Sequence, residues 1–108
     1  MKMISYWKQP EEIYQDDGLT LIIGWYDHKN QENGGEKALG IYWGNDYPQS
    51  RGILSPCVIP ATTRNAILSG LLHQAVTTNK TTQIDGILKA ITFFNATALT
   101  HPLSGNFA

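Results

Sequence analysis

The strongest constraint on the fold is a change in the spacing of apolar residues close to Pro60. Before this point apolar side chains alternate in short runs, whereas after it they recur every three or four residues. Alternation is typical of a strand with one buried face, and a spacing of about 3.6 residues is typical of a helix that lies on a core. The sequence therefore predicts strands in the first part of the chain and helices in the second.

Residues 19–26 give the clearest strand signal, because they are rich in β-branched and aromatic types and form a run too short for a helix. Alternate residues of this run, from Leu19 to Trp25, are expected to share one face. Residues 27–37 are polar and contain Asn-Gly-Gly, which is a strong turn signal. We therefore expect a long hairpin loop that leads to a return strand at 38–43.

Two further segments before Pro60 have mixed signals. Residues 53–59 are apolar enough for a strand, but Pro56 lacks the N–H group that a ladder hydrogen bond needs. This segment is predicted as an edge or interrupted strand. Near the N-terminus, Pro10 and the two acidic residues after it resemble the first turn of a helix, so 9–15 is predicted as a short helical turn.

The second part of the chain predicts two helices, at 61–77 and at 82–95. The second begins with Thr82 and an acidic residue three positions later, a pattern that resembles a capping box. Each helix contains an interior glycine, Gly70 or Gly86, which costs about 1 kcal/mol relative to alanine. We expect close approach to another element to explain both glycines.

Together these elements predict an α+β fold in a single domain that spans 1–108. The domain would consist of a small antiparallel sheet, made of a hairpin plus an edge strand, packed against two C-terminal helices. Antiparallel pairing follows from the short link between the first two strands. A chain of 108 residues supports one core of this kind and not two.

Several features indicate a reduced, cytoplasmic protein. Cys57 is the only cysteine, so no intramolecular disulfide can form. No run approaches the roughly 18 apolar residues of a membrane span, and the N-terminus lacks the apolar segment of a signal peptide. We therefore interpret the Asn-x-Thr triplets at Asn79 and Asn95 as chance matches and not as glycan acceptors.

The formal net charge of -1 hides an uneven distribution. Residues 1–50 carry eight acids against four bases, a net charge of -4, and residues 51–108 carry four bases against one acid, a net charge of +3. Four scattered bases do not form the clustered basic face of a nucleic-acid-binding protein. The acidic half would instead attract a basic partner.

The residues that most often carry chemistry form no catalytic or metal-binding group in the sequence. His28, His73 and His101 lack the spacing by which two imidazoles share a metal ion, and residues 40–44 lack the spacing of a dinucleotide-binding loop. Cys57 lies among apolar residues, so we expect it to be buried. We therefore expect no enzyme activity, metal or cofactor, with a nucleophilic Cys57 as the alternative.

The aromatic residues supply the positive argument for a binding role. Trp25, Tyr26, Tyr42, Trp43 and Tyr47 concentrate on the predicted hairpin and the turn after it. Tryptophan and tyrosine are enriched at the energetic centres of protein interfaces, and one face of the predicted sheet is expected to meet solvent or a partner. The alternative is that both tryptophans of this group belong to the core.

Three stretches of the middle part, at 41–48, 52–56 and 67–72, resemble small bacterial immunity proteins of contact-dependent growth inhibition systems. The similarity extends over 19–76. It implies a cytoplasmic, non-enzymatic protein that binds a toxin domain, often a nuclease, in a one-to-one complex, without nucleic acid or membrane as a partner. It assigns no role to a particular residue.

We therefore expect the acidic half and its aromatic residues to contact a basic toxin domain. The candidate contact residues are Glu11, Glu12, Asp16, Asp17, Asp27, Glu32, Glu36, Tyr42, Asp46 and Tyr47. Two alternatives remain open. The protein would be a small cytoplasmic enzyme that uses Cys57, or a homo-oligomeric regulatory or structural module whose aromatic hairpin packs on a second copy.

Overall fold

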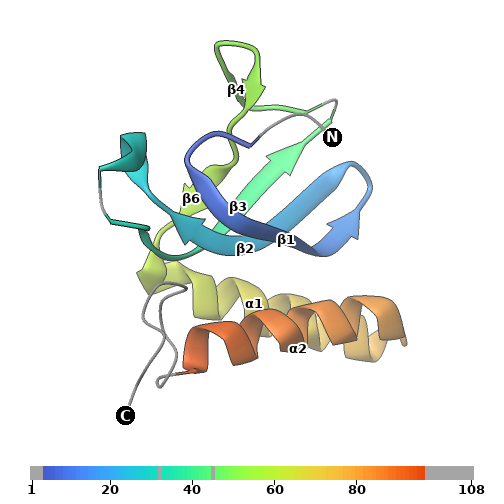
Figure 1. The fold of residues 1–108 in the computed structure, drawn as a ribbon. Helices are drawn as coiled ribbons and strands as arrows, with labels where there is room; N and C mark the ends of the chain where they lie inside the picture. The colour runs from blue at the N-terminus through green and yellow to red at the C-terminus, as the bar shows by residue number, and fades with distance from the viewer. Residues whose placement is uncertain (1–3, 32, 45, 97–108) are drawn as a thin grey trace.

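The computed structural model describes residues 4–31, 33–44 and 46–96 (Figure 1). In chain order its elements are β1 (Trp7–Asp16), β2 (Leu19–Tyr26), the 3-10 helix η1 (His28–Asn30), β3 (Glu36–Trp43), β4 (Gln49–Ser50), β5 (Ile53–Leu54), β6 (Cys57–Ile59), α1 (Ala61–Thr77) and α2 (Thr81–Asn95). Four strands form an antiparallel sheet in the order β1-β2-β3-β6, and β4 pairs with β5. The expected α+β fold, with a sheet packed on two C-terminal helices, is confirmed.

The segment predicted as a helical turn at 9–15 is instead part of β1. This strand pairs with β2 from Trp7 opposite Tyr26 to Asp16 opposite Leu19, with two irregularities in register. Because β1 lies at the edge of the sheet, Pro10 can occupy it without leaving a ladder bond unmade. Proline and charged residues also discourage a second chain from pairing with an exposed edge. The pattern that resembled a helix start therefore belongs to a protected edge strand.

The central strands bury both of their faces. On one side, Leu21 of β2 packs in a cluster that includes Ile87 of α2 and residues of α1. On the other side, Ile22 packs with Trp7 and Leu54. The expected alternation along β2 is confirmed, because Leu19 and Ile23 lie with Leu21 in the helix-side cluster and Trp25 contacts Phe93 of α2. The expectation of a whole sheet face open to solvent or a partner is wrong.

The face opposite the helices is covered by the N-terminal segment and by the β4–β5 ribbon. Ile4 forms a β-bridge with Leu54, and the Ser5 N–H donates to the Leu54 carbonyl at 2.8 Å. Pro56 separates β5 from β6, so the predicted interrupted strand at 53–59 is confirmed. The first strand, β5, contributes Leu54 to the cluster around Ile22 and Trp7. The second strand, β6, extends the main sheet beside β3.

Both helices form where the 3.6-residue spacing predicted them. α1 has the predicted bounds, whereas α2 begins one residue earlier, at Thr81, which places Thr82 inside the first turn. No side chain caps α2, so the predicted capping box is wrong. Gly86 confirms the expected close approach, because a Cβ there would lie 1.8 Å from the Ile13 carbonyl oxygen. Gly70 does not, because a Cβ there would meet nothing within 4 Å.

Lys37 of β3 fixes the C-terminal end of α2 to the sheet. Its ammonium group donates to the carbonyl oxygens of Phe93 at 2.6 Å and Ala96 at 3.0 Å. These bonds satisfy carbonyls that a helix end leaves without intrahelical partners. Burial, followed by the nearby charge of Arg64, lowers the pKa of Lys37.

Among the described helices, none is long and apolar enough to span a membrane.

Candidate interaction surface

Two turns meet at one end of the main sheet. The first joins β1 to β2 through Asp17 and Gly18, both with positive φ angles. The second follows β3 and begins at Gly44, whose N–H donates to the Gly18 carbonyl oxygen at 2.9 Å. Asp46 lies in this second turn. The register of the strands thus brings together acidic residues that are far apart in the sequence.

Two aromatic residues stand beside these acids. Trp43 and Tyr47 form an antiparallel bridge. The backbone N–H of Trp43 donates to the carbonyl oxygen of Tyr47 at 2.7 Å, and the backbone N–H of Tyr47 donates to the carbonyl oxygen of Trp43 at 2.9 Å. Directly opposed residues of such a pair project to the same side. Trp43 is 45% exposed and Tyr47 is 53% exposed, so a core role for Trp43 is excluded. Trp25, in contrast, is half-buried and packs its ring edge-on against Phe93.

We call this part of the molecule the acidic–aromatic end, defined by Asp16, Asp17, Trp43, Asp46 and Tyr47. Its three carboxylates and two exposed aromatic residues lie in two hydrogen-bonded turns, and neither turn contains a described lysine or arginine. The Tyr14 hydroxyl donates to the Asp16 carboxylate at 3.5 Å. Burial, followed by this carboxylate, raises the pKa of Tyr14. Four of the predicted contact residues are thus brought together, along with Trp43.

The predicted contact residues in the middle of β1 have partners within the fold. Glu12 accepts a hydrogen bond of 2.5 Å from the hydroxyl of Tyr42, which is only 7% exposed. Burial, then the hydrogen bond and charge of Glu12, raise the pKa of Tyr42 to about 12. Glu11 forms an ion pair with Lys89 of α2. The burial of Tyr42 argues against its direct contact with a partner.

The remaining predicted contact residues lie at the opposite end of the sheet. Asp27 follows β2 and is only 3% exposed, and its carboxylate accepts the Gly34 N–H at 2.9 Å, which shapes the loop. Glu36 is exposed at the start of β3, opposite Tyr26. The length of β2 places this end about 25 Å from the acidic–aromatic end. Glu32 lies outside the described residues.

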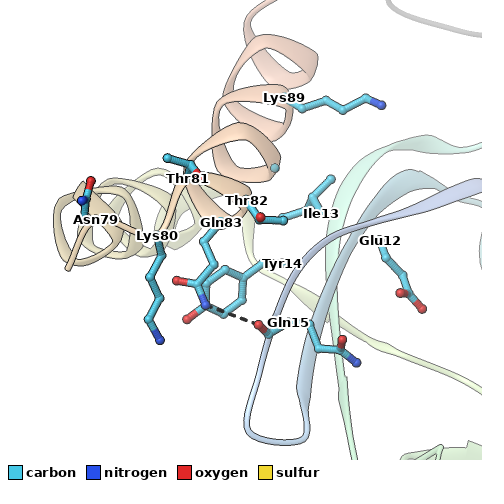
Figure 2. A pocket seen from close by; sticks show the side chains of 11 residues that line it. Glu12, Ile13, Tyr14, Gln15, Asn79, Lys80, Thr81, Thr82, Gln83 and Lys89 are labelled. Carbon is cyan, nitrogen blue, oxygen red and sulfur yellow. Dashed lines mark hydrogen bonds between the residues drawn. The ribbon is translucent and has the colours of Figure 1, made fainter. Parts of the chain in front are cut away.

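A shallow cleft of about 670 Å³ lies between β1 and the start of α2, as Figure 2 shows. The residues that line it include Tyr14, Gln15, Lys80 and Gln83. The Gln83 amide donates to the Gln15 carbonyl oxygen at 3.4 Å and so covers part of the strand edge. This cleft has no signal in the sequence, because strand and helix residues about 65 positions apart line it together.

Cys57 is exposed on the edge strand β6, so the expectation of a buried thiol is wrong. Its neighbour Val58 is also exposed, because only one side of this short strand is paired. His28 accepts or donates a hydrogen bond of 3.0 Å with the Tyr26 hydroxyl, and His73 lies exposed on α1. Among the described residues, no three potential metal ligands gather at one place.

The chain matches no protein-family model, and no curated protein sequence or solved structure matches it significantly. Its surface must therefore be interpreted from its own geometry. That geometry keeps Asp16, Asp17, Asp46 and Tyr47 as one contact group and adds Trp43 to it. The sequence feature that points to Trp43 as a contact residue is its place in an aromatic cluster next to a turn. The sequence alone could not show that Trp43, and not Trp25, is exposed.

Proposed function

We propose that this protein is a non-enzymatic, cytoplasmic immunity protein that binds and blocks a basic toxin domain of the nuclease type through its acidic–aromatic end. The observation that supports this function is the meeting of three carboxylates with two exposed aromatic side chains at one end of the sheet. A nuclease domain carries basic groups that hold phosphates. The acidic–aromatic end has the complementary charge, and its carboxylates repel phosphate groups.

The two kinds of residue at this end support different parts of binding. Carboxylates raise the rate at which a basic partner arrives in the correct orientation. Exposed tryptophan and tyrosine bury large areas with few rotatable bonds, and they slow dissociation. The backbones of Trp43 and Tyr47 are held by two hydrogen bonds, so little backbone freedom remains to be lost on binding.

The experiment is to mix the purified chain with the toxin domain encoded by the neighbouring gene and to measure mass and toxin activity together. We expect a free monomer of 12.0 kDa, a one-to-one complex, and loss of toxin activity at equal molar amounts. A free mass that is a multiple of this value would support the homo-oligomeric module. Absence of a complex with the toxin domain would contradict the proposed function.

The enzyme alternative is tested at Cys57, whose exposure lets a thiol reagent reach it in the native protein. Labelling alone therefore does not separate the two functions. Cys57→Ser and the alkylated wild-type chain are both expected to neutralise the toxin as well as the untreated protein does. Loss of neutralisation in both, with the fold intact, would favour the enzyme that uses Cys57.

A further inference from the structure

We propose that the acidic–aromatic end binds an arginine side chain of the partner, whose guanidinium group stacks on Trp43 while the carboxylates of the two turns balance its charge. The proposal rests on the proposed function only in taking the partner to be a basic protein. It identifies the chemical group that this surface recognises, and it can be tested on the free chain.

A row of residues across three strands provides the surface on which the guanidinium group would lie. Asp16 lies opposite Leu19, and Leu19 lies opposite Trp43, so the three side chains project from the same face of the sheet. Neighbouring strands are about 4.8 Å apart, which separates the backbones of Asp16 and Trp43 by about 10 Å. Tyr47 continues the row on the far side of Trp43. The half-buried Leu19 thus forms a floor between a carboxylate and two aromatic side chains.

Two aromatic rings elsewhere in the fold, on α2, already have cationic partners. The Arg64 guanidinium lies 3.9 Å from the centre of the Phe94 ring, and the Lys37 ammonium lies 4.9 Å from the centre of the Phe93 ring. No cation from the described residues lies over Trp43 or Tyr47. The exposed pair is therefore the aromatic site at which a cation from another molecule can stack.

The chemistry of this site favours arginine over lysine. Guanidinium is planar, weakly hydrated and able to stack on an aromatic face while its N–H groups point outward to carboxylates. Indole is the best aromatic partner for a cation. Asp16 lies two strands from Trp43 in the same row, and Asp46 lies in the turn between Trp43 and Tyr47, so both carboxylates can accept those N–H groups. A lysine ammonium is a point charge that keeps its water and gains less from stacking.

The test uses the full ¹⁵N-labelled chain and three blocked tripeptides with Arg, Lys or citrulline at the centre. Citrulline has nearly the shape of arginine but no charge. We expect the arginine peptide to shift the Trp43 indole N–H and the amides of Asp17 and Gly44, with affinity about fivefold higher than that of the lysine peptide. The citrulline peptide should cause no such shifts. Equal shifts with all three peptides would overturn the proposal.

Matched variants separate the site from the rest of the surface. Trp43→Ala and Asp16→Asn should each weaken binding of the arginine peptide at least about fivefold. Val76→Ala, at an equally exposed apolar residue of α1, and Asp85→Asn, at an exposed aspartate of α2, should leave it unchanged. An equal loss in the control variants would refute the site.

The same variants distinguish this inference from the proposed function. If the wild-type chain neutralises the toxin domain but Trp43→Ala binds it with unchanged affinity, the arginine site is wrong and the function stands. If the arginine peptide binds as expected but no complex forms with the toxin domain, the site stands and the proposed function is wrong.

Discussion

At the scale of single residues, the pairing of Glu12 with Tyr42 shows how a carboxylate that resembles a binding residue has a structural role. The Tyr42 hydroxyl is buried and donates to the charged Glu12 carboxylate at 2.5 Å. A hydrogen bond to an ionised acceptor is about twice as strong as a neutral one. Because Glu12 is exposed and Tyr42 is buried, removal of Glu12 is the change that would leave a buried polar group without this contact.

This pair predicts loss of stability at alkaline pH. The pKa of Tyr42 is about 12 in the folded chain and 10.0 when unperturbed, so the unfolded chain releases this proton first. The contribution of Tyr42 to stability is therefore present below pH 10 and is lost as pH rises toward 12, by at most about 1.4 kcal/mol per pH unit. Denaturant unfolding across this pH range, with tyrosinate absorbance of the native protein, measures both quantities.

Adjacent glutamates provide the control for this prediction. Glu12→Gln removes the charge that raises the pKa of Tyr42, so its absorbance titration should move to lower pH. Glu11→Gln, which removes the partner of Lys89, should leave that titration unchanged. If both variants shift the titration equally, the pKa of Tyr42 does not depend on the hydrogen bond to Glu12.

At the scale of elements, the contact of α2 with β1 depends on a glycine. A Cβ at Gly86 would lie 1.8 Å from the Ile13 carbonyl oxygen, a distance that requires the helix or the strand to move. Gly70 occupies a similar interior position in α1, but a Cβ there would meet nothing within 4 Å. The two glycines therefore have the same cost in helix propensity, but only Gly86 is required by a close contact with another element.

Substitution of each glycine by alanine should have effects of opposite sign. Gly70→Ala should stabilise the chain by about 0.5 to 1 kcal/mol, because it gains helix propensity without a clash. Gly86→Ala should destabilise it by about 2 kcal/mol or more, because displacement of packed elements outweighs the same gain. Denaturant unfolding of both variants measures the difference. Stabilisation by both substitutions would show that α2 does not pack tightly on β1.

The elements that the sequence predicted correctly are those with a sustained apolar period. β2 and α1 have the expected bounds because their buried faces repeat without interruption. β1 was missed because an edge strand with two register irregularities does not alternate regularly, and because Pro10 with two acids is also a common helix start. Register could not be inferred either, so the pairing of the Asp17 turn with the Gly44 turn was visible only in three dimensions.

At the scale of the whole molecule, the charges are separated along the sheet and not simply along the chain. The acidic–aromatic end carries three aspartates, whereas the opposite end carries Lys8, Lys29, Lys37 and Arg64 beside Glu36 and the buried Asp27. Both ends draw residues from the first half of the sequence. A net charge of -1 is therefore compatible with a strong local field at either end. Such a field orients a basic partner toward the acidic–aromatic end.

This orientation predicts the effect of charge reversal on association with the proposed toxin partner. Asp16→Lys, Asp17→Lys and Asp46→Lys together should slow association by about tenfold or more at low salt and flatten its dependence on ionic strength. Dissociation should change less, because Trp43 and Tyr47 remain. Stopped-flow kinetics at several salt concentrations measure both rates.

The control for this experiment keeps part of the change in net charge but places it on α2, outside the two turns. Asp85→Lys reverses one exposed aspartate on α2, and its effect on association should be far smaller than that of any single reversal at the acidic–aromatic end. An equal effect of Asp85→Lys and Asp46→Lys would mean that overall charge, and not the arrangement of the two turns, attracts the partner. Because screening weakens interactions beyond about 10 Å at 0.1 M salt, the two explanations diverge most clearly at that concentration.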